Sequence, residues 1–217
     1  MKLINKRTRS LAVIIAITLC FLPILALTGC GKEIAENKVF SADDLSGKVL
    51  GVQLGTTGDI FMTDYEKDGS GTKVERFSKG SDAIQSLKLG KVDAVVIDIE
   101  PAKAFVKANG ELMILEEPFV TEDYAICVAK ENKDLTSRIN TALAQLKSEG
   151  TLEKIINNYI GDAAGNSPYV SPDNINRNNG TLTMATNAYF KPYEYYENGK
   201  IVGIDVDMAN AIADKLG

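Results

Sequence analysis

Two predicted strands end in polar side chains that could bind a small charged ligand. Thr56 and Thr57 lie in a glycine-flanked turn after the strand predicted at 48–53, and Asp98 follows the strand predicted at 92–97. Open α/β sheets bind ligands at the carboxyl ends of their strands. Free N–H groups at the helix after the turn suit a carboxylate, and a lone carboxylate such as Asp98 can pair with an ammonium group. The alternative is that Thr57 and Asp98 only cap helices.

The composition argues against an enzyme and against a cofactor. The chain has no histidine, which removes Ser-His-Asp and Cys-His catalysis and the commonest zinc ligand. It contains no Walker loop and no G-x-G-x-x-G motif. Acid-rich spots such as Asp43-Asp44 lack EF-hand spacing and are typical of a solvated surface. We therefore predict that the chain is not an enzyme and that it holds no metal or cofactor.

The first 29 residues are predicted to be a lipoprotein signal peptide. A basic start and an apolar stretch, 11–26, precede the run LTGC at 27–30, which matches a lipoprotein box with Cys30 as the lipidated residue. The alternative is an uncleaved anchor helix, but the apolar stretch is short for a span and is interrupted by Pro23. A diacylated Cys30 would attach the protein to the extracytoplasmic face of the cell membrane.

Charge and cysteine content narrow the partners further. Removal of the four positive charges of the leader takes the formal charge of −5 to −9, which argues against nucleic acid. Cys20 leaves with the leader and Cys30 is predicted to carry lipid, so Cys127 would be the single free thiol. Its apolar neighbours predict that Cys127 is a buried strand residue.

The middle of the chain alternates between strand and helix patterns. Strands are predicted at 48–53, 74–77, 92–97 and 112–115, with helices at 59–66, at 81–89 and from about Pro101. This alternation predicts a small, mainly parallel sheet with helices on both faces. A β-rich run, 123–130, precedes helices at 135–149 and 152–159. The Gly-, Pro-, Ser- and Asn-rich residues 161–179 are the clearest linker, and a short strand at 181–185 and a helix beginning near Asp205 follow it.

Several of these runs resemble one known family. The run GIDVDM at 203–208, followed by Ile212-Ala213, resembles the opening βα unit of the family 3 periplasmic solute-binding proteins, which deliver amino acids to ABC importers. The runs GVQLGTTG, GKVDAVVID and LKSEGTLEKIINNYIG resemble the second half of the same family. The resemblance implies an α/β clamshell of the type II periplasmic-binding-protein class, with one lobe near complete and the other partial.

The resemblance also implies an organisation of the chain. After the signal peptide, 1–29, and a lead-in, 30–47, residues 48–160 would hold the second lobe, a crossing strand and the returning helices. Residues 161–179 would be a linker, and 180–217 the first βα unit of a first lobe. Three origins of this order stay open: a fragment of a tandem protein, which the junction-like linker favours, a permuted form, or a half-protein that pairs with another chain.

Ligand-binding roles follow from the resemblance residue by residue. The Thr of the 54–58 turn would contact the ligand α-carboxylate, Asp98 its α-amino group, and Gln53 its side chain. Asn187 matches a position that lines the cleft, and Phe190 matches an aromatic residue of the ligand platform. An amino-acid ligand and an ABC permease are the implied partners; the alternative is an extracytoplasmic sensory or receptor domain of the same fold.

One family feature has no counterpart in this sequence. The family's first lobe carries a Ser/Thr-rich loop and an Arg that forks onto the ligand carboxylate, and Arg76 and Arg138 lie in other elements. A bidentate Arg–carboxylate pair is the strongest polar contact of such a site. We therefore expect this chain to bind free amino acids poorly or not at all.

Overall fold

The computed structural model describes residues 36–37, 39–162, 164–165 and 167–217, which all belong to one compact unit, Glu36–Gly217. The predicted signal peptide and Cys30 lie outside these residues. None of the helices in the described ranges is long and apolar enough to span a bilayer. The division of the chain into a second lobe, a linker and a first βα unit stays a prediction.

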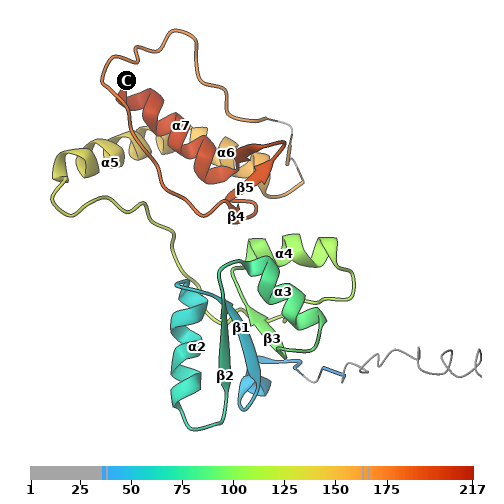
Figure 1. Cartoon of the computed structure of the whole chain (residues 1–217). Helices are drawn as coiled ribbons and strands as arrows, with labels where there is room; N and C mark the ends of the chain where they lie inside the picture. Colours follow the sequence, from blue (N-terminus) through green and yellow to red (C-terminus); the bar gives the residue numbers. More distant parts are fainter. Residues whose placement is uncertain (1–35, 38, 163, 166) are drawn as a thin grey trace, which may run out of the picture. The chain divides into compact units, whose positions relative to one another are not determined.

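A three-stranded parallel sheet forms the first part of the described chain. Its strands are β1 (Val49–Gln53), β2 (Lys73–Phe77) and β3 (Ala94–Val96), in the order β2-β1-β3. Helix α2 (Thr57–Lys67) covers one face, and α3 (Gly80–Lys88) covers the other, next to α4 (Ile99–Ala108) (Figure 1). The short η2 turn (Ala42–Leu45) precedes β1. The predicted parallel sheet with helices on both faces is confirmed.

The period-2 pattern of β1 explains this layering. Leu50 and Val52 point to one face, where they are fully buried with Val74 of β2 and Met62 of α2. Gly51 points to the other face, where an added Cβ would lie 3.3–3.4 Å from side chains of the sheet and the segment before β3. The small residue therefore leaves room for these neighbouring side chains on that face.

The second part of the described chain is a helical layer with a small antiparallel sheet. Helices α5 (Lys133–Ser148), α6 (Thr151–Tyr159) and α7 (Ile204–Leu216) pack together (Figure 1). Strands β4 (Tyr189–Phe190), β5 (Glu194–Glu197) and β6 (Lys200–Val202) form the order β4-β5-β6. A shared core joins the three helices; its buried members are Ile139, Ala142, Leu146, Ile155, Ile204, Ala211 and Ile212.

The predicted linker lies along α7 instead of hanging free. The described residues of 161–179 form no helix or strand. However, the hydroxyl of Tyr169 donates to Asp214 at 2.9 Å, and Arg177 forms an ion pair with the same carboxylate at 2.7 Å. The side-chain amide of Asn179 donates to the carbonyl oxygen of Leu216 at 2.7 Å. These contacts hold the segment on the helix that follows it.

Three predicted strands are wrong. The structure has no strand at 112–115, at 123–130 or at 181–185. A strand is defined by hydrogen bonds to a neighbour, and within the described ranges these segments have no neighbouring strand to pair with. The expected burial of Cys127 as a strand residue is also wrong, because the thiol is exposed.

Candidate functional site

The N-terminus of α2 lies at the carboxyl edge of the sheet, as the sequence predicts. Thr56 is the N-cap: its Oγ1 accepts from the N–H of Asp59 at 3.4 Å and donates to the carbonyl oxygen of Gln53 at 2.8 Å. An added Cβ on Gly58 would lie 3.1 Å from the carbonyl oxygen of Val96. The glycine therefore lets the first turn of α2 approach the end of β3 closely.

Asp98 follows the same edge two residues after β3. Val52 of β1 pairs with Val96 of β3, so the chain segments that leave the two strands start side by side. Asp98 occupies the N-cap position of α4, but its side chain makes no capping hydrogen bond. Its carboxylate therefore stays available to a group outside the helix, which weakens the alternative of a plain cap for Asp98.

Gln53 has a structural role at this edge. It is the last residue of β1 and is only 3% exposed. Its Oε1 accepts from the N–H of Gly80 at 3.1 Å, which fixes the start of α3 against the sheet. The contact with a ligand side chain that the resemblance implies for Gln53 stays a prediction.

Two residues that the sequence did not indicate form hydrogen bonds with the site residues at this edge. The hydroxyl of Thr57 donates to the carboxylate of Glu122, and the hydroxyl of Tyr124 donates to the carboxylate of Asp98. Burial and the neighbouring Asp98 carboxylate raise the pKa of Tyr124 well above its ordinary value. Tyr124 belongs to the run 123–130, predicted as a crossing strand, and Glu122 directly precedes it. Only the placement of this run next to the carboxyl edge of β1 and β3 could have indicated the two contacts.

Phe190 and Asn187 differ in how they relate to this edge. Phe190 stacks on Tyr193, with ring centroids 6.0 Å apart, and Tyr193 meets the Tyr124 ring edge-on at 4.8 Å. The structure therefore connects Phe190 to Asp98 through two tyrosines. Asn187 is exposed, and its carbonyl oxygen accepts from the N–H of Tyr189 at 2.7 Å. None of its contacts joins it to the other site residues in the described chain.

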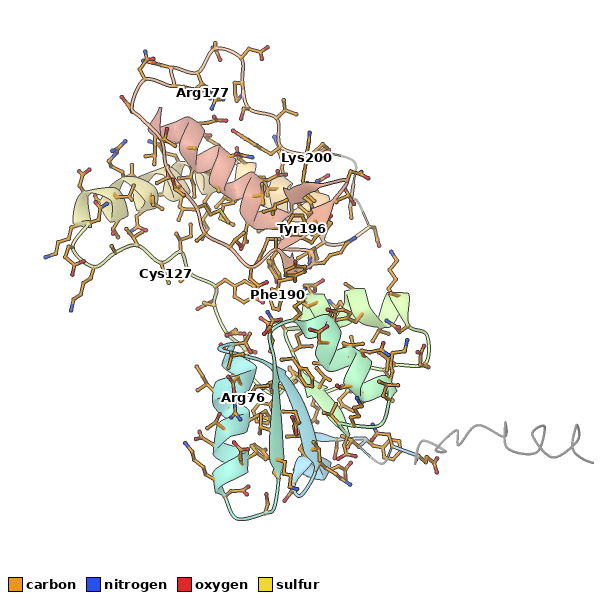
Figure 2. The ribbon with its side chains drawn as sticks, viewed as in Figure 1. Arg76, Cys127, Arg177, Phe190, Tyr196 and Lys200 are labelled. Carbon is orange, nitrogen blue, oxygen red and sulfur yellow. The ribbon has the colours of Figure 1, made fainter. Side chains whose placement is uncertain are left out.

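The two arginines that the sequence analysis considered for the carboxylate fork, Arg76 and Arg138, form ion pairs elsewhere. Arg76 pairs with Asp59 at 2.8 Å and with Glu66 at 3.2 Å, and Figure 2 shows it between β2 and α2. A hydrogen bond from the N–H of Gly55, followed by the Arg76 pair, holds the pKa of Asp59 below its usual value. The guanidinium of Arg138 lies 3.8 Å from the carboxylate of Asp134 on the same helix.

Among the described residues, no cluster of three or more His, Cys, Asp or Glu side chains could hold a metal ion.

Comparisons with known proteins agree with this architecture. The family model described as bacterial extracellular solute-binding proteins, family 3, matches residues 182–217. The L-cystine-binding protein TcyJ of Escherichia coli (strain K12) is 30% identical over 131 residues, which cover 60% of this chain and 48% of TcyJ. The chain thus spans about half the length of the curated relatives it matches.

Solved structures extend the likeness to the fold. An ancestral arginine-binding protein bound to arginine matches with a TM-score of 0.54 and 42% identity over 59% of this chain and 57% of that chain. An ancestral arginine-binding protein bound to glutamine matches with a TM-score of 0.52 and 39% identity over 59% of this chain and 56% of that chain.

The chain is similar to the family 3 bacterial extracellular solute-binding proteins, and it resembles a part of the α/β periplasmic-binding-protein fold of the solved structures. The resemblance to this family and the fold class that the sequence predicts are confirmed. The expectation of a binding protein, and not an enzyme, agrees with a family of solute-binding proteins.

Proposed function

We propose that the carboxyl edge of β1 and β3 binds the α-carboxylate and α-ammonium groups of a polar amino acid. The observation that carries this proposal is the juxtaposition, at one edge, of the α2 N-terminus with Thr56 and Thr57 and of Asp98, whose side chain does not cap its helix. Helix N–H groups favour a carboxylate, and the Asp98 carboxylate favours an ammonium. Relatives named or solved with cystine, arginine and glutamine support a polar amino acid as the ligand class.

The same proposal extends to transport. The protein would be a lipoprotein, attached through Cys30 to the extracytoplasmic face of the cell membrane, that passes its ligand to the permease of an ABC importer. The support is the lipoprotein box at 27–30 together with relatives described as ABC-transporter binding proteins. Gln53 is proposed to contact the ligand side chain, Asn187 to line the cleft, and Phe190 to form part of the aromatic platform under the ligand.

Asp98 provides the direct test of this site. Because Arg76, Arg138 and Arg177 are each paired with another carboxylate, we expect only millimolar binding of L-arginine or L-glutamine. This binding should be seen as shifts of the Thr57 and Gly58 amide signals in an NMR titration. Replacement of Asp98 by Asn should weaken binding by about fivefold, since an exposed charge pair contributes up to about 1 kcal/mol. Asp82→Asn, on an exposed carboxylate of α3, is the matched control and should change nothing. Amide signals that stay in place at saturating ligand would refute the proposed site.

Glu122 should compete with the ligand for the same donor. Its carboxylate already accepts from Thr57, where a ligand carboxylate is proposed to bind. Glu122→Gln removes that negative charge, so we expect it to tighten the binding of L-glutamine by a few-fold in the same titration. Glu117→Gln, on an exposed carboxylate of the preceding loop, serves as the control. Weaker binding by Glu122→Gln would mean that Glu122 contacts the ligand instead of excluding it.

A further inference from the structure

The segment 122–130, EDYAICVAK, forms no helix or strand, and most of its backbone N–H and C=O groups are unpaired among the described residues. Within the described chain, its residues 122–128 make no backbone–backbone hydrogen bond, and Ile126 and Tyr124 are 49% and 54% exposed. Figure 2 shows Cys127 on the coil that leads to α5. The composition is nevertheless that of a strand, with β-branched and aromatic residues and neither Gly nor Pro. An open, apolar edge of this kind is a template for pairing with another strand.

The order of side chains along residues 122–130 favours antiparallel pairing with the same segment of a second copy. The even-numbered face carries Tyr124, Ile126 and Val128 between Glu122 at one end and Lys130 at the other. In an antiparallel pair, residues directly opposite each other share a face. A strand with an acid at one end, a base at the other and apolar residues between is therefore complementary to a reversed copy of itself.

We propose that residues 122–130 form an interface with a second copy of this chain, as an antiparallel strand pair with Ile126 on the two-fold axis. Tyr124 then lies opposite Val128 of the second copy, an aromatic and β-branched pair. Glu122 lies opposite Lys130 of the second copy, and symmetry makes both contacts twice. The charge complementarity of the two ends selects the second copy as the occupant of this edge.

Charge excludes the register centred one residue later, at Cys127. A perpendicular two-fold axis places some residue opposite itself, so the candidates are registers centred on a residue. A centre at Cys127 would put Asp123 opposite Glu131 of the second copy, which is a repulsive like-charge pair. The centre at Ile126 has opposite charges at both ends and no like-charged pair within 122–130.

The backbone fixes which residues form the hydrogen-bonded pairs. The carbonyl oxygen of Ala129 accepts from the N–H of Asn132 at 2.8 Å, so this odd-numbered carbonyl already points into the following turn. The even-numbered residues are then the ones whose N–H and C=O groups face the open edge. Ala125 and Cys127 of the second copy become a non-hydrogen-bonded pair, with Cα atoms about 4.5 Å apart. That separation is within the range of a disulfide.

Disulfide cross-linking tests this register. In the full chain carrying Cys20→Ser and Cys30→Ser, Ala125→Cys should give several-fold more covalent dimer on mild oxidation than the parent, whose Cys127 residues lie diagonally across the axis. Ala129→Cys is the matched control: it faces Asp123 of the second copy and should give no more dimer than the parent. Equal yields from the two variants, or dimer from Ala129→Cys alone, would overturn the register.

A second variant tests the interface without a disulfide. Ile126→Glu places two carboxylates opposite each other on the axis and should abolish both the Ala125→Cys cross-link and dimer in analytical ultracentrifugation. Val170→Glu changes another exposed apolar side chain, 77% exposed, and should leave the dimer intact. A parent chain that stays monomeric at all concentrations, or that cross-links only to a different protein, would overturn the proposal.

Discussion

Replacing Gly203 with alanine is expected to unfold the corner where β6 enters α7. Gly203 has a φ of +134°, a backbone conformation that residues other than glycine rarely adopt. An added Cβ would lie 2.1 Å from the carbonyl oxygen of Tyr193. That oxygen also accepts from the N–H of Asp205 at 2.9 Å, and the carbonyl oxygen of Pro192 accepts from Ile204 at 3.2 Å. The Cβ cannot enter without breaking these contacts, which hold the first turn of α7 on the small sheet.

The expected cost of Gly203→Ala is about 4 kcal/mol or more, the sum of a strained φ and a clash with backbone that cannot rotate away. Hydrogen exchange measured by mass spectrometry should show loss of protection across α7 and the helices it packs on, α5 and α6. Retained protection of α7 would contradict this account of the corner.

Gly199 provides a matched control that separates strain from steric clash. It also has a positive φ, of +77°, but an added Cβ there would meet nothing within 4 Å. Gly199→Ala should therefore cost about 1 kcal/mol, the penalty of a left-handed conformation without a clash. If both variants lost the same stability, the close approach at Gly203 would not be the cause.

The sequence predicts a strand correctly where that strand has a neighbour. Runs 48–53, 74–77 and 92–97 have a strand-like composition and are separated by helices, and they pair as the parallel strands β1, β2 and β3. Runs 123–130 and 181–185 have the same strand-like composition, but the described chain offers them no partner. The sequence of a segment shows that it could form a strand. Whether it does so depends on hydrogen bonds to a second segment, which the sequence of the first one does not reveal.

The candidate site also contains residues that the sequence could predict and residues that it could not. Thr56 and Asp98 could be predicted because strand ends and turn glycines mark the carboxyl edge of a sheet. Glu122 and Tyr124 could not, because their contacts with Thr57 and Asp98 join segments 65 and 26 residues apart. The sequence also did not predict the hydrogen bond that Gln53 accepts from the N–H of Gly80, because this bond depends on how α3 packs against β1.

The stability of the β4–β6 and α7 region should fall as the pH rises from about 5 to about 8. The cause is Glu194 of β5, a carboxyl group only 7% exposed whose Oε2 has no hydrogen-bond partner among the described residues. Burial, together with the negative charge of Asp205 in the first turn of α7, raises the pKa of Glu194 to about 8. Burial also raises the pKa of Asp205.

The direction follows from which state holds more protons. An unfolded Glu releases its proton near its ordinary pKa of 4.5, whereas the folded Glu194 keeps it up to about pH 8. Between these values the folded state binds more protons, so its stability falls with rising pH. The contribution is complete below the unfolded pKa and is lost as the pH passes the folded pKa. With allowance for solvent screening, we expect a loss of about 2 kcal/mol.

Glu194→Gln should remove this dependence, because the neutral amide has nearly the same shape and has no proton to lose. The variant should be as stable at pH 9 as at pH 5, and more stable than the parent at pH 9, in urea denaturation followed by circular dichroism. Glu197→Gln, exposed on the same strand, is the control and should keep the slope of the parent. The chain has no histidine, so no histidine titration obscures the range between pH 5 and 8. A parent whose stability rises over this range would show that Glu194 is ionised in the folded state.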